Sequence, residues 1–315
     1  MGTAPVPEDS GPRVSVVVRT KNRPEFLRRA LESITGQSFT LWECIIVNDG
    51  GDPVPVDQLV ERLPQDHRDR IRVLHSAGSR GRWTSANAGV LAGSAPLLVL
   101  HDDDDTWHPD FLASAVAYLD DNPDRVGVVS RIEIVWEEFA DGEFTEVRRE
   151  PFQAHLHDPL LSDTLLFNRF VPIAFVYRRA LHEELGLYDE RLPVVGDWAF
   201  NLRVLSLSAL EFLGDKPLVS WHQRAGTAGA GGNSVIDARD DHAKFDARIR
   251  DEALREYVGE EGLGLVLYLT QFIDRRFVDI ENGIRAEIRE ASTWHRAKDK
   301  LDRTVARALP RRRRR

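Results

Sequence analysis

A short apolar segment, residues 97–100, leads through His101 into four consecutive aspartates, Asp102 to Asp105. Such a segment is typical of a strand buried inside a parallel sheet. Carboxylates crowded at the end of a strand repel one another unless a cation or a helix N-terminus offsets their charge. Mg²⁺ and Mn²⁺ prefer oxygen ligands and leave coordination positions for substrate phosphates. The pattern therefore predicts a divalent-metal site; the alternative interpretation is a solvated acidic loop that caps the next helix.

A basic turn that contains glycine, residues 76–82, would suit a substrate that carries phosphates. Arg80 and Arg82 could neutralise phosphate oxygens there, and an ordinary exposed loop is an equal alternative. The chain has no Gly-x-Gly-x-x-Gly after its first predicted strand and no Gly-x-x-x-x-Gly-Lys-Ser/Thr motif, which argues against a dinucleotide site and a P-loop. It also lacks the Gly-x-Ser-x-Gly and His-Glu-x-x-His motifs.

The elements that must position these residues alternate between strands and helices. Strands are expected at residues 14–18, 43–47, 71–75 and 97–100, and helices follow the first and third of them. This alternation predicts an α/β fold with a mostly parallel central sheet flanked by helices. Ligands of such sheets bind beyond the carboxyl ends of the strands. Three polar loops should meet there: residues 20–23, 48–51 and 101–105.

The pattern changes after residue 121. The sequence predicts strands at 126–136, 173–177 and 218–221, a charged hairpin at 139–149, and helices at 179–185 and from about Asp197. Residues 224–234 are rich in Gly and Ala and are expected to form a mobile loop. From residue 237 onward the pattern is helical, and this region is compatible with packing on the rest of the chain, pairing as a homo-oligomer, or lying on a membrane.

Composition narrows the class of protein. The 315 residues carry a net charge of −9, which argues against general nucleic-acid binding. The single cysteine, Cys44, allows no intrachain disulfide and favours a reducing, cytoplasmic compartment. No apolar run approaches the roughly 20 residues of a membrane span. Residues 296–315 are strongly basic, which fits either a solvated end or peripheral contact with an anionic inner membrane face.

Four segments, in order, resemble the signatures of the family 2 glycosyltransferases. Residues 14–24 (VSVVVRTKNRP) are similar to the family's opening strand and loop, and residues 45–51 (IIVNDGG) to its second strand and base-binding turn. Residues 85–89 (SANAG) resemble its third signature, and residues 100–109 resemble its DxD region with the trailing Trp and Pro. Weaker similarity continues to about residue 224.

The resemblance implies a GT-A fold and a nucleotide-diphospho-sugar donor, with a UDP-sugar favoured. It also implies a divalent cofactor, Mn²⁺ or Mg²⁺, and transfer to a hydroxyl of a glycan, lipid-linked or other acceptor with inversion at the anomeric carbon. The domain organisation expected from it is a flexible N-terminus at 1–12, a catalytic domain at 13–235, a helical region at 236–309 and a polybasic tail at 310–315. Within the catalytic domain, residues 13–121 would bind the nucleotide and residues 122–235 the acceptor.

The same resemblance assigns roles on the donor side. Thr20, Asn22 and Arg23 would line the base and ribose pocket. Asp49 would hydrogen-bond the base, with local turn chemistry as the alternative. Two further expected donor contacts are Asn87 and Asp103.

Within the aspartate run, Asp102 to Asp104 would form the DxD motif. Asp104 would contact the metal directly, and Asp102 would contact ribose or metal-bound water. Asp105 is expected to cap the next helix. His222 resembles a C-terminal histidine that completes the metal or diphosphate site, and a structural role is its equal alternative.

An inverting transfer needs a base to accept the proton of the acceptor hydroxyl. Residues 194–200 (VVGDWAF) resemble the family's base position, which assigns this role to Asp197; a helix N-cap is the alternative. Trp198 is expected in the core. Two departures from the family pattern are Gly196, where an acid is common, and Gly51 in place of the usual Ser.

Two other functions compete with this one. A nucleotidyltransferase usually opens with a Gly-rich loop, and residues 19–23 contain no glycine. A catalytically inactive carbohydrate-binding module would not need Asp197 together with the acidic run.

Overall fold

The computed structural model describes residues 11–224 and 239–308, with side chains as far as residue 289. The chain divides into two compact units, residues 1–248 and 249–315. The expected loop at 224–234, apart from its first residue, and the polybasic tail lie outside the described residues, as does most of the predicted flexible N-terminus.

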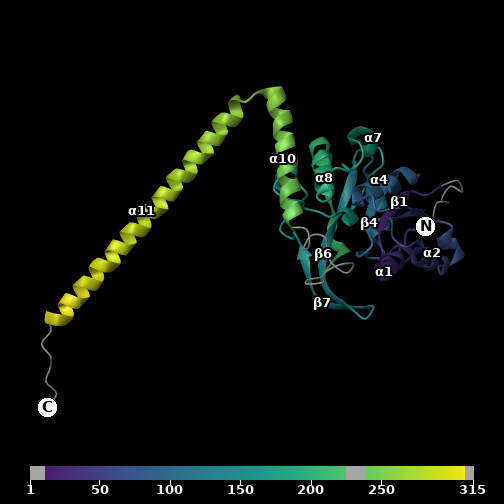
Figure 1. Cartoon of the computed structure of the whole chain (residues 1–315), viewed down its shortest axis with the longest axis horizontal. Helices are drawn as coiled ribbons and strands as arrows, with labels where there is room; N and C mark the ends of the chain where they lie inside the picture. The colour runs from purple at the N-terminus through teal and green to yellow at the C-terminus, as the bar shows by residue number, and fades with distance from the viewer. Residues whose placement is uncertain (1–10, 225–238, 309–315) are drawn as a thin grey trace, which may run out of the picture. The chain divides into compact units, whose positions relative to one another are not determined.

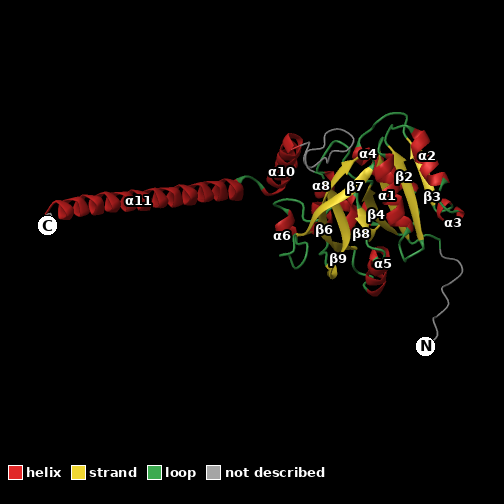
Figure 2. Cartoon of the chain, turned by 90° about the horizontal axis from the view of Figure 1, so that it is seen from below, coloured by secondary structure: helices red, strands yellow, loops and turns green. Residues whose placement is uncertain are grey.

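The first half of unit 1 is a parallel sheet. Its strands are β1 (Val14–Thr20), β2 (Trp42–Asn48), β3 (Ile71–His75) and β4 (Leu97–Asp102), in the order β3-β2-β1-β4. Register pairs Thr20 with Asn48 and Arg19 with Asp102, so the polar strand ends lie at one edge. Helices α1 (Pro24–Thr35), α2 (Pro53–Glu61), α3 (Gln65–Arg68) and α4 (Arg82–Ala92) connect these strands. Figure 2 shows the strands side by side with the helices around them.

The local sequence explains these elements. All seven residues of β1 are buried, because the strand lies between β2 and β4 and helices cover its faces. α1 starts with Pro24, which suits the first helical turn, and buries one apolar face made of Phe26, Leu27, Ala30, Leu31 and Ile34. Gly89 of α4 allows close packing on β1, since a Cβ there would lie 2.2 Å from a methyl carbon of Val17.

The second half of unit 1 extends the sheet with mixed pairings. β8 (Phe175–Arg178) pairs antiparallel with β4 and with β6 (Gly127–Ala140). β6 also pairs antiparallel with β7 (Glu143–Phe152) and parallel with β9 (Phe212–Gln223). The short strand β5 (Thr106–Trp107) pairs antiparallel with β9. The helical elements here are α5 (Phe111–Asp121), α6 (Leu161–Thr164), the 3₁₀ turn η1 (Pro172–Ala174), α7 (Leu181–Leu185) and α8 (Gly196–Leu207).

The predicted α/β fold with a central sheet and helical extension is confirmed, and several details differ. Helices α2 and α3 follow β2, where no helix was predicted. The sheet is mostly parallel only in its first half, because the later strands join it antiparallel. Arg82 starts α4 instead of lying in the basic turn. Asp105 does not cap α5, whose N-cap position is Asp110, because Asp105 turns inward to the backbone of His222. The expectation that Trp198 is a core residue is correct: it is buried, and its indole N–H bonds the Thr164 carbonyl at 2.6 Å.

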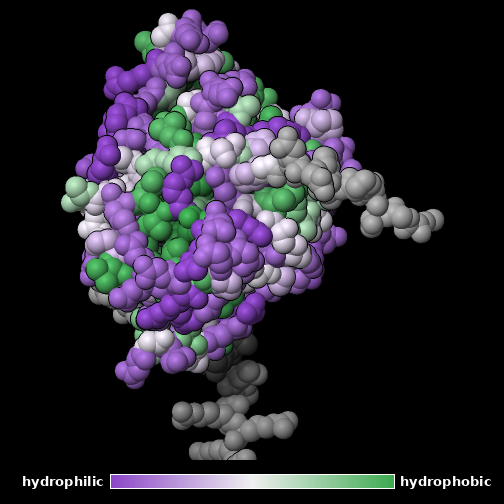
Figure 3. All heavy atoms as spheres, turned by 90° about the vertical axis from the view of Figure 1, so that its right-hand side faces the viewer, coloured by the Kyte–Doolittle hydropathy of each residue, from purple (hydrophilic) through white to green (hydrophobic). Residues whose placement is uncertain are grey.

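The face of unit 1 in Figure 3 is mainly hydrophilic, with limited apolar areas, as expected of a chain in which 30% of residues are charged.

The C-terminal part is helical, as predicted. α10 (Arg239–Glu261) spans the boundary between the units, and α11 (Gly264–Ala308) continues as one unbroken helix (Figure 1). α11 exposes a series of large apolar side chains that includes Leu269, Phe272, Ile273, Phe277, Ile280, Ile284 and Ile288. None of the described helices has the length and apolar character needed to cross a bilayer.

Candidate functional site

Asp102, the last residue of β4, and the three aspartates that follow it point alternately outward and inward. Asp103 is buried, with 5% of its side chain exposed, and accepts hydrogen bonds from Thr20 Oγ1 and Arg23, both at 2.8 Å. Asp105 is also buried and accepts the backbone N–H of His222 at 2.8 Å. The side chains of Asp102 and Asp104 are more open, at 36% and 13% exposed. The inward pair therefore anchors the loop, and the outward pair is the more accessible of the two.

Arginines surround the outward pair. Arg19 pairs with Asp102, while Arg23, at 2.9 Å, and Arg224 both donate to Oδ2 of Asp104. Burial alone would raise the pKa of Asp104, but Arg23 and Arg224 hold it at about 2. Asp104 is therefore ionised, and its negative charge is neutralised by protein cations.

A buried glutamate on β6, Glu137, organises the opposite side of the cluster. Its carboxylate accepts from Arg224 at 2.6 Å, from Arg29 at 2.7 Å, and from Nδ1 of His222 at 2.7 Å. Burial opposes ionisation, yet the hydrogen bonds from His222 and Arg29 lower the pKa of Glu137 to about 2. Sequence reasoning missed Glu137, which looks like one more acid of a charged hairpin; only the pairing of β6 with β9 reveals its role.

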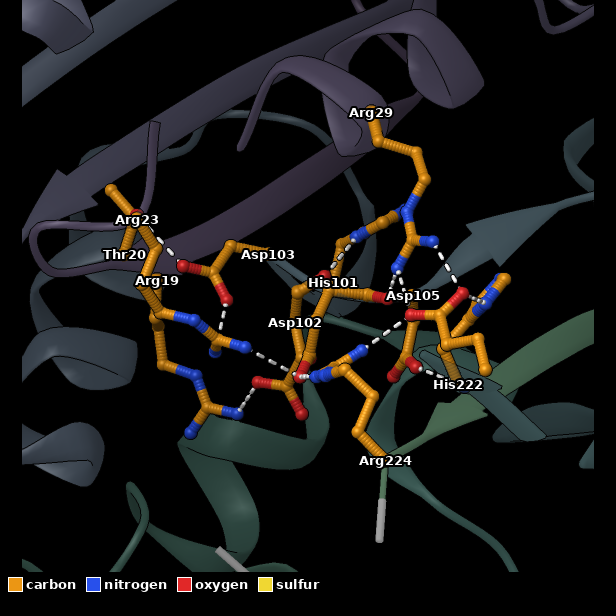
Figure 4. Close-up of polar contacts among 12 residues, drawn as sticks. Arg19, Thr20, Arg23, Arg29, His101, Asp102, Asp103, Asp105, His222 and Arg224 are labelled. Carbon is orange, nitrogen blue, oxygen red and sulfur yellow. Dashed lines mark hydrogen bonds and ion pairs between the residues drawn. The ribbon is translucent and has the colours of Figure 1, made fainter. Parts of the chain in front are cut away.

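His222 is held within this network. Its Nδ1 faces Glu137, and its Nε2 lies 2.8 Å from Oγ1 of Thr106. Both ring nitrogens thus have protein partners, which favours the structural alternative, and the predicted metal role would require an exchange of partners. Figure 4 shows His222 and Arg224 on one side of the aspartates and Arg19, Thr20 and Arg23 on the other.

Two carboxylates could hold a cation here. Asp102 and Asp104 are the more exposed aspartates of the run, and each offers a second carboxylate oxygen besides the one that pairs with arginine. Within residues 11–224 and 239–289, no three carboxylate, imidazole or thiolate groups converge as a ready cation site. The residues therefore fit a divalent cation that takes its other ligands from water or phosphate, as Mg²⁺ usually does.

The predicted base pocket lies at the ends of β1 and β2. Asp49 accepts from Oγ of Ser79 and the backbone N–H of Arg80, both at 2.7 Å, and from the N–H of Gly81 at 3.2 Å. Burial opposes this ionised state, but these bonds lower the pKa of Asp49. Asp49 thus orders a loop distant in sequence, which neither the base contact nor the local turn interpretation anticipated.

Asn22 shapes the same pocket. Its backbone is left-handed, with φ at 52°, and its Oδ1 accepts the N–H of Asp52 at 2.9 Å. A Cβ on Gly51 would lie 2.6 Å from Oδ1 of Asn48 and 2.7 Å from Oδ1 of Asn22. This crowding explains why glycine stands where the family usually has Ser.

The remaining donor-side residues differ in placement. Arg80 projects an exposed side chain, and Arg82 is half-buried near Arg19. Asn87 is buried, and its amide bonds the backbone of Tyr188 in both directions and the side chain of Glu190. This geometry favours a structural role for Asn87 over the predicted donor contact, because its polar atoms already have protein partners.

Asp197 lies in the first turn of α8. The N-cap is Val195, left-handed with φ at 56°, so the N-cap alternative for Asp197 is wrong. Burial raises the pKa of Asp197. The hydrogen bond from the backbone N–H of Trp198 and the nearby Arg82 and Arg19 oppose the rise, while Asp102 adds to it. Asp197 therefore shares one electrostatic site with the outward aspartates.

Two neighbours of Asp197 were not predicted as site residues. A Cβ on Gly196 would lie 2.6 Å from the Trp83 ring, which explains why glycine replaces the family's usual acid. His242 lies at the start of α10, within unit 1. The charge of Asp197 raises the pKa of His242, but burial lowers it more. His242 lies in the helical region, where the sequence offered no motif.

The sequence profile described as Glycosyl transferase family 2 matches residues 15–186. The chain belongs to this family. One family 2 relative, the uncharacterized glycosyltransferase YwdF of Bacillus subtilis, is 35% identical over 192 residues, which cover 61% of this chain and 67% of YwdF. A PGL/p-HBAD biosynthesis glycosyltransferase of Mycobacterium tuberculosis is 28% identical over 203 residues, covering 64% of this chain and 73% of that protein.

Solved structures establish the fold of this family 2 chain. The mannosyltransferase PcManGT of Pyrobaculum calidifontis, in complex with GDP-Man and Mn²⁺, matches with a TM-score of 0.54 at 19% identity, covering 78% of this chain and 65% of that one. TarS of S. aureus in complex with UDP-GlcNAc matches with a TM-score of 0.51 at 21% identity, covering 70% and 61%. This chain thus spans somewhat less than two thirds of either structure. The GT-A fold expected from the sequence is confirmed, and the chain is a family 2 glycosyltransferase.

Proposed function

We propose that this chain is a metal-dependent, inverting glycosyltransferase that moves a sugar from a nucleotide-diphospho-sugar, preferably a UDP-sugar, to a hydroxyl group. A glycan or lipid-linked molecule is the proposed acceptor. The observation that carries the proposal is the outward pair Asp102 and Asp104, set among arginines at the carboxyl edge of the parallel sheet. Such an edge is where open α/β sheets bind ligands.

The mixture of carboxylates and guanidinium groups suits a diphosphate bound with a cation. Arg23 and Arg224 pair with Asp104. Phosphate oxygens offer guanidinium groups equally good bidentate partners. When donor binds, the two arginines would transfer from Asp104 to the diphosphate, and Asp104 would become available to Mn²⁺ or Mg²⁺. A divalent cation held there would offset the charge that develops on the leaving nucleoside diphosphate.

The nucleotide would lie over the ends of β1 and β2. Thr20, Asn22 and Arg23 would border the bound nucleotide, and Asp49 would lie beneath its base. A carboxylate accepts roughly four hydrogen bonds, and Asp49 accepts three from residues 79–81. The Ser85 side chain also bonds Asp49, so the preference for UDP follows from the family resemblance and is tested by the donor panel below.

Asp197 would accept the proton of the acceptor hydroxyl. Its side chain is half-buried, and a base is most effective when its pKa approaches the working pH. The direction of its pKa shift, upward through burial, is the one that this role requires. Arg82 and Arg19 limit the shift, so the carboxylate is still ionised when the acceptor arrives.

A thermal-shift panel tests the donor class. The full chain is heated with UDP-glucose, UDP-galactose, UDP-GlcNAc or GDP-mannose, each with and without Mn²⁺, because a ligand of the native state stabilises by mass action. We expect Mn²⁺-dependent stabilisation by at least one UDP-sugar and slow release of UDP from it. Release of pyrophosphate instead would indicate a nucleotidyltransferase, and binding without turnover toward any acceptor pool would indicate an inactive module.

A further inference from the structure

We infer that Asn168, oriented by Asn201, is a positioning residue for the carboxylate of Asp197. The inference rests on the proposed function, in which Asp197 accepts a proton from the acceptor. Asn168 bonds one oxygen of that carboxylate, and together with the backbone N–H of Trp198 it would fix how the carboxylate faces the acceptor hydroxyl. Neither asparagine belongs to a sequence signature of the donor site.

The contacts come from two separate segments. Asn168 lies between α6 and η1, and its Nδ2 donates to Oδ2 of Asp197 at 2.8 Å. Asn201 lies four residues after Asp197 on α8, and its Nδ2 donates to Oδ1 of Asn168 at 2.9 Å. Residues four apart lie on the same face of a helix. One face of α8 therefore binds both ends of the Asn168 amide.

The hydrogen-bond partners determine which way each amide points. The Nδ2 group of Asn201, which is buried, also lies 3.4 Å from the carbonyl oxygen of Phe170. Since a carbonyl oxygen only accepts, the NH₂ group of Asn201 must face it, and the atom of Asn168 facing Asn201 must be the acceptor Oδ1. The NH₂ group of Asn168 is then left to face Asp197. An amide N–H donated to a carboxylate favours the ionised form, which is the form a base needs.

Other charged and titratable groups around Asp197 set its electrostatic field but do not replace this directional bond. Burial raises the pKa of Asp197, and the backbone N–H of Trp198 and the arginines of β1 and α4 oppose the rise. The surrounding groups that interact with Asp197 are Arg19, Arg82, Asp102, Tyr188 and His242. None of these five residues is altered in the Asn168 variants, so the effect of Asn168 can be measured separately.

The test compares three variants of the full chain. Asn168→Ala removes the donor, and Asn168→Asp keeps the shape but places a second carboxylate beside Asp197. Asn122→Ala is the matched control, because the Asn122 amide bonds only the Tyr118 carbonyl at the end of α5. Each protein is labelled with ¹³C at the aspartate carboxyl carbon and titrated by NMR, and the Asp197 signal is identified by its loss in Asp197→Asn.

We expect the titration of Asp197 to move to higher pH in Asn168→Ala, further in Asn168→Asp, and not at all in Asn122→Ala. Turnover of the UDP-sugar selected by the thermal-shift panel should fall about tenfold in Asn168→Ala with little change in KM, because the base is less well oriented. The acidic limb of the pH profile of turnover in Asn168→Ala should move in the same direction as the NMR titration of Asp197. Asn168→Asp should regain activity at high pH.

Two failures are distinguishable. An unchanged Asp197 titration in both Asn168 variants, together with an inactive Asp197→Asn protein, would overturn the positioning role and leave the proposed function standing. Full turnover by Asp197→Asn would overturn the proposed base itself, and the role of Asn168 with it.

Discussion

Arg224 and Asp104 lie 120 residues apart in the sequence and form an ion pair beside the carboxyl end of β4. The guanidinium of Arg224 is fully buried and also bonds Glu137. This pair connects the residue after β9 to the aspartate predicted to bind the metal. Because Arg224 and Arg23 already neutralise the charge of Asp104, a cation alone should bind weakly to this carboxylate. A cation that arrives with a diphosphate should bind more tightly, since the diphosphate can pair with the two arginines.

Mn²⁺ and UDP should therefore bind cooperatively. We expect UDP to increase the affinity for Mn²⁺ by about 5- to 150-fold, the usual range of coupling between two sites. Calorimetric titration of Mn²⁺ into the full chain, with and without UDP, measures this factor. Asp104→Ala should abolish the metal-dependent part of UDP binding, while Asp124→Ala, an exposed acid elsewhere, should behave as the unchanged protein. Equal Mn²⁺ affinity with and without UDP would contradict the exchange of arginine partners.

Replacing Asp197 with Asn should separate binding from chemistry. The amide has the same shape but cannot accept a proton, so kcat should fall by about 10²- to 10⁴-fold. The affinity for UDP in the presence of Mn²⁺ should not change, because Asp197 lies on the proposed acceptor side. Steady-state kinetics and calorimetry test the two halves, with Asp124→Asn as the isosteric control. A proportional loss of UDP affinity and kcat would instead place Asp197 in donor binding.

The stability of unit 1 should depend on His182 below neutral pH. Burial lowers the pKa of His182, whose Nδ1 faces the carbonyl of Gly186 and whose Nε2 faces the hydroxyl of Tyr177. At a pH between the pKa of His182 in the folded chain and its ordinary pKa, the unfolded chain binds more protons than the folded chain. The contribution of His182 to the free energy of unfolding is therefore fully present above the ordinary histidine pKa and is lost as the pH falls toward the folded pKa. The slope is at most about 1.4 kcal/mol per pH unit for one proton.

His182→Gln should remove this part of the pH dependence. Urea unfolding of the wild-type and variant proteins between pH 5 and 7 gives the difference in slope, and other titrating groups cancel in the comparison. His155→Gln, at an exposed histidine, serves as the control. Parallel pH profiles for wild type and His182→Gln would exclude His182 as a contributor.

Gly196 should not tolerate a side chain. A Cβ would lie 2.6 Å from Cε2 and Nε1 of Trp83, whose ring also stacks on Tyr188. Gly196→Ala should cost about 1–3 kcal/mol through overpacking, and the cost should shrink in a Trp83→Leu background. Gly259→Ala in α10 has open space around it and should be neutral or slightly stabilising. Denaturant unfolding of the wild type, Gly196→Ala, Trp83→Leu and the double variant measures the coupling between the two positions. An unaltered cost of Gly196→Ala in the Trp83→Leu background would refute the contact.

Local patterns in the sequence determined the elements of the fold. The apolar runs of β1, β2 and β4, and the one-sided apolar pattern of α1, predicted strands and a helix because side-chain period depends only on neighbouring residues. The acidic run after β4 also predicted where the outward pair would lie, since parallel strands end at one edge. The roles proposed for Asp104 and Asp197 remain predictions for the experiments above.

Only the tertiary structure decided how that edge is completed. Glu137 and Arg224 reach the aspartates because β6 and β9 pair in one register, and Asn168 reaches Asp197 because a connection packs against α8. These partners are separated by 29 to 120 residues and carry no local pattern. Contacts with Thr20, Arg23 and His222 likewise determine that Asp103 and Asp105 are the two aspartates that face inward. The sequence could not show this, because burial and pairing depend on the three-dimensional environment and not on residue type.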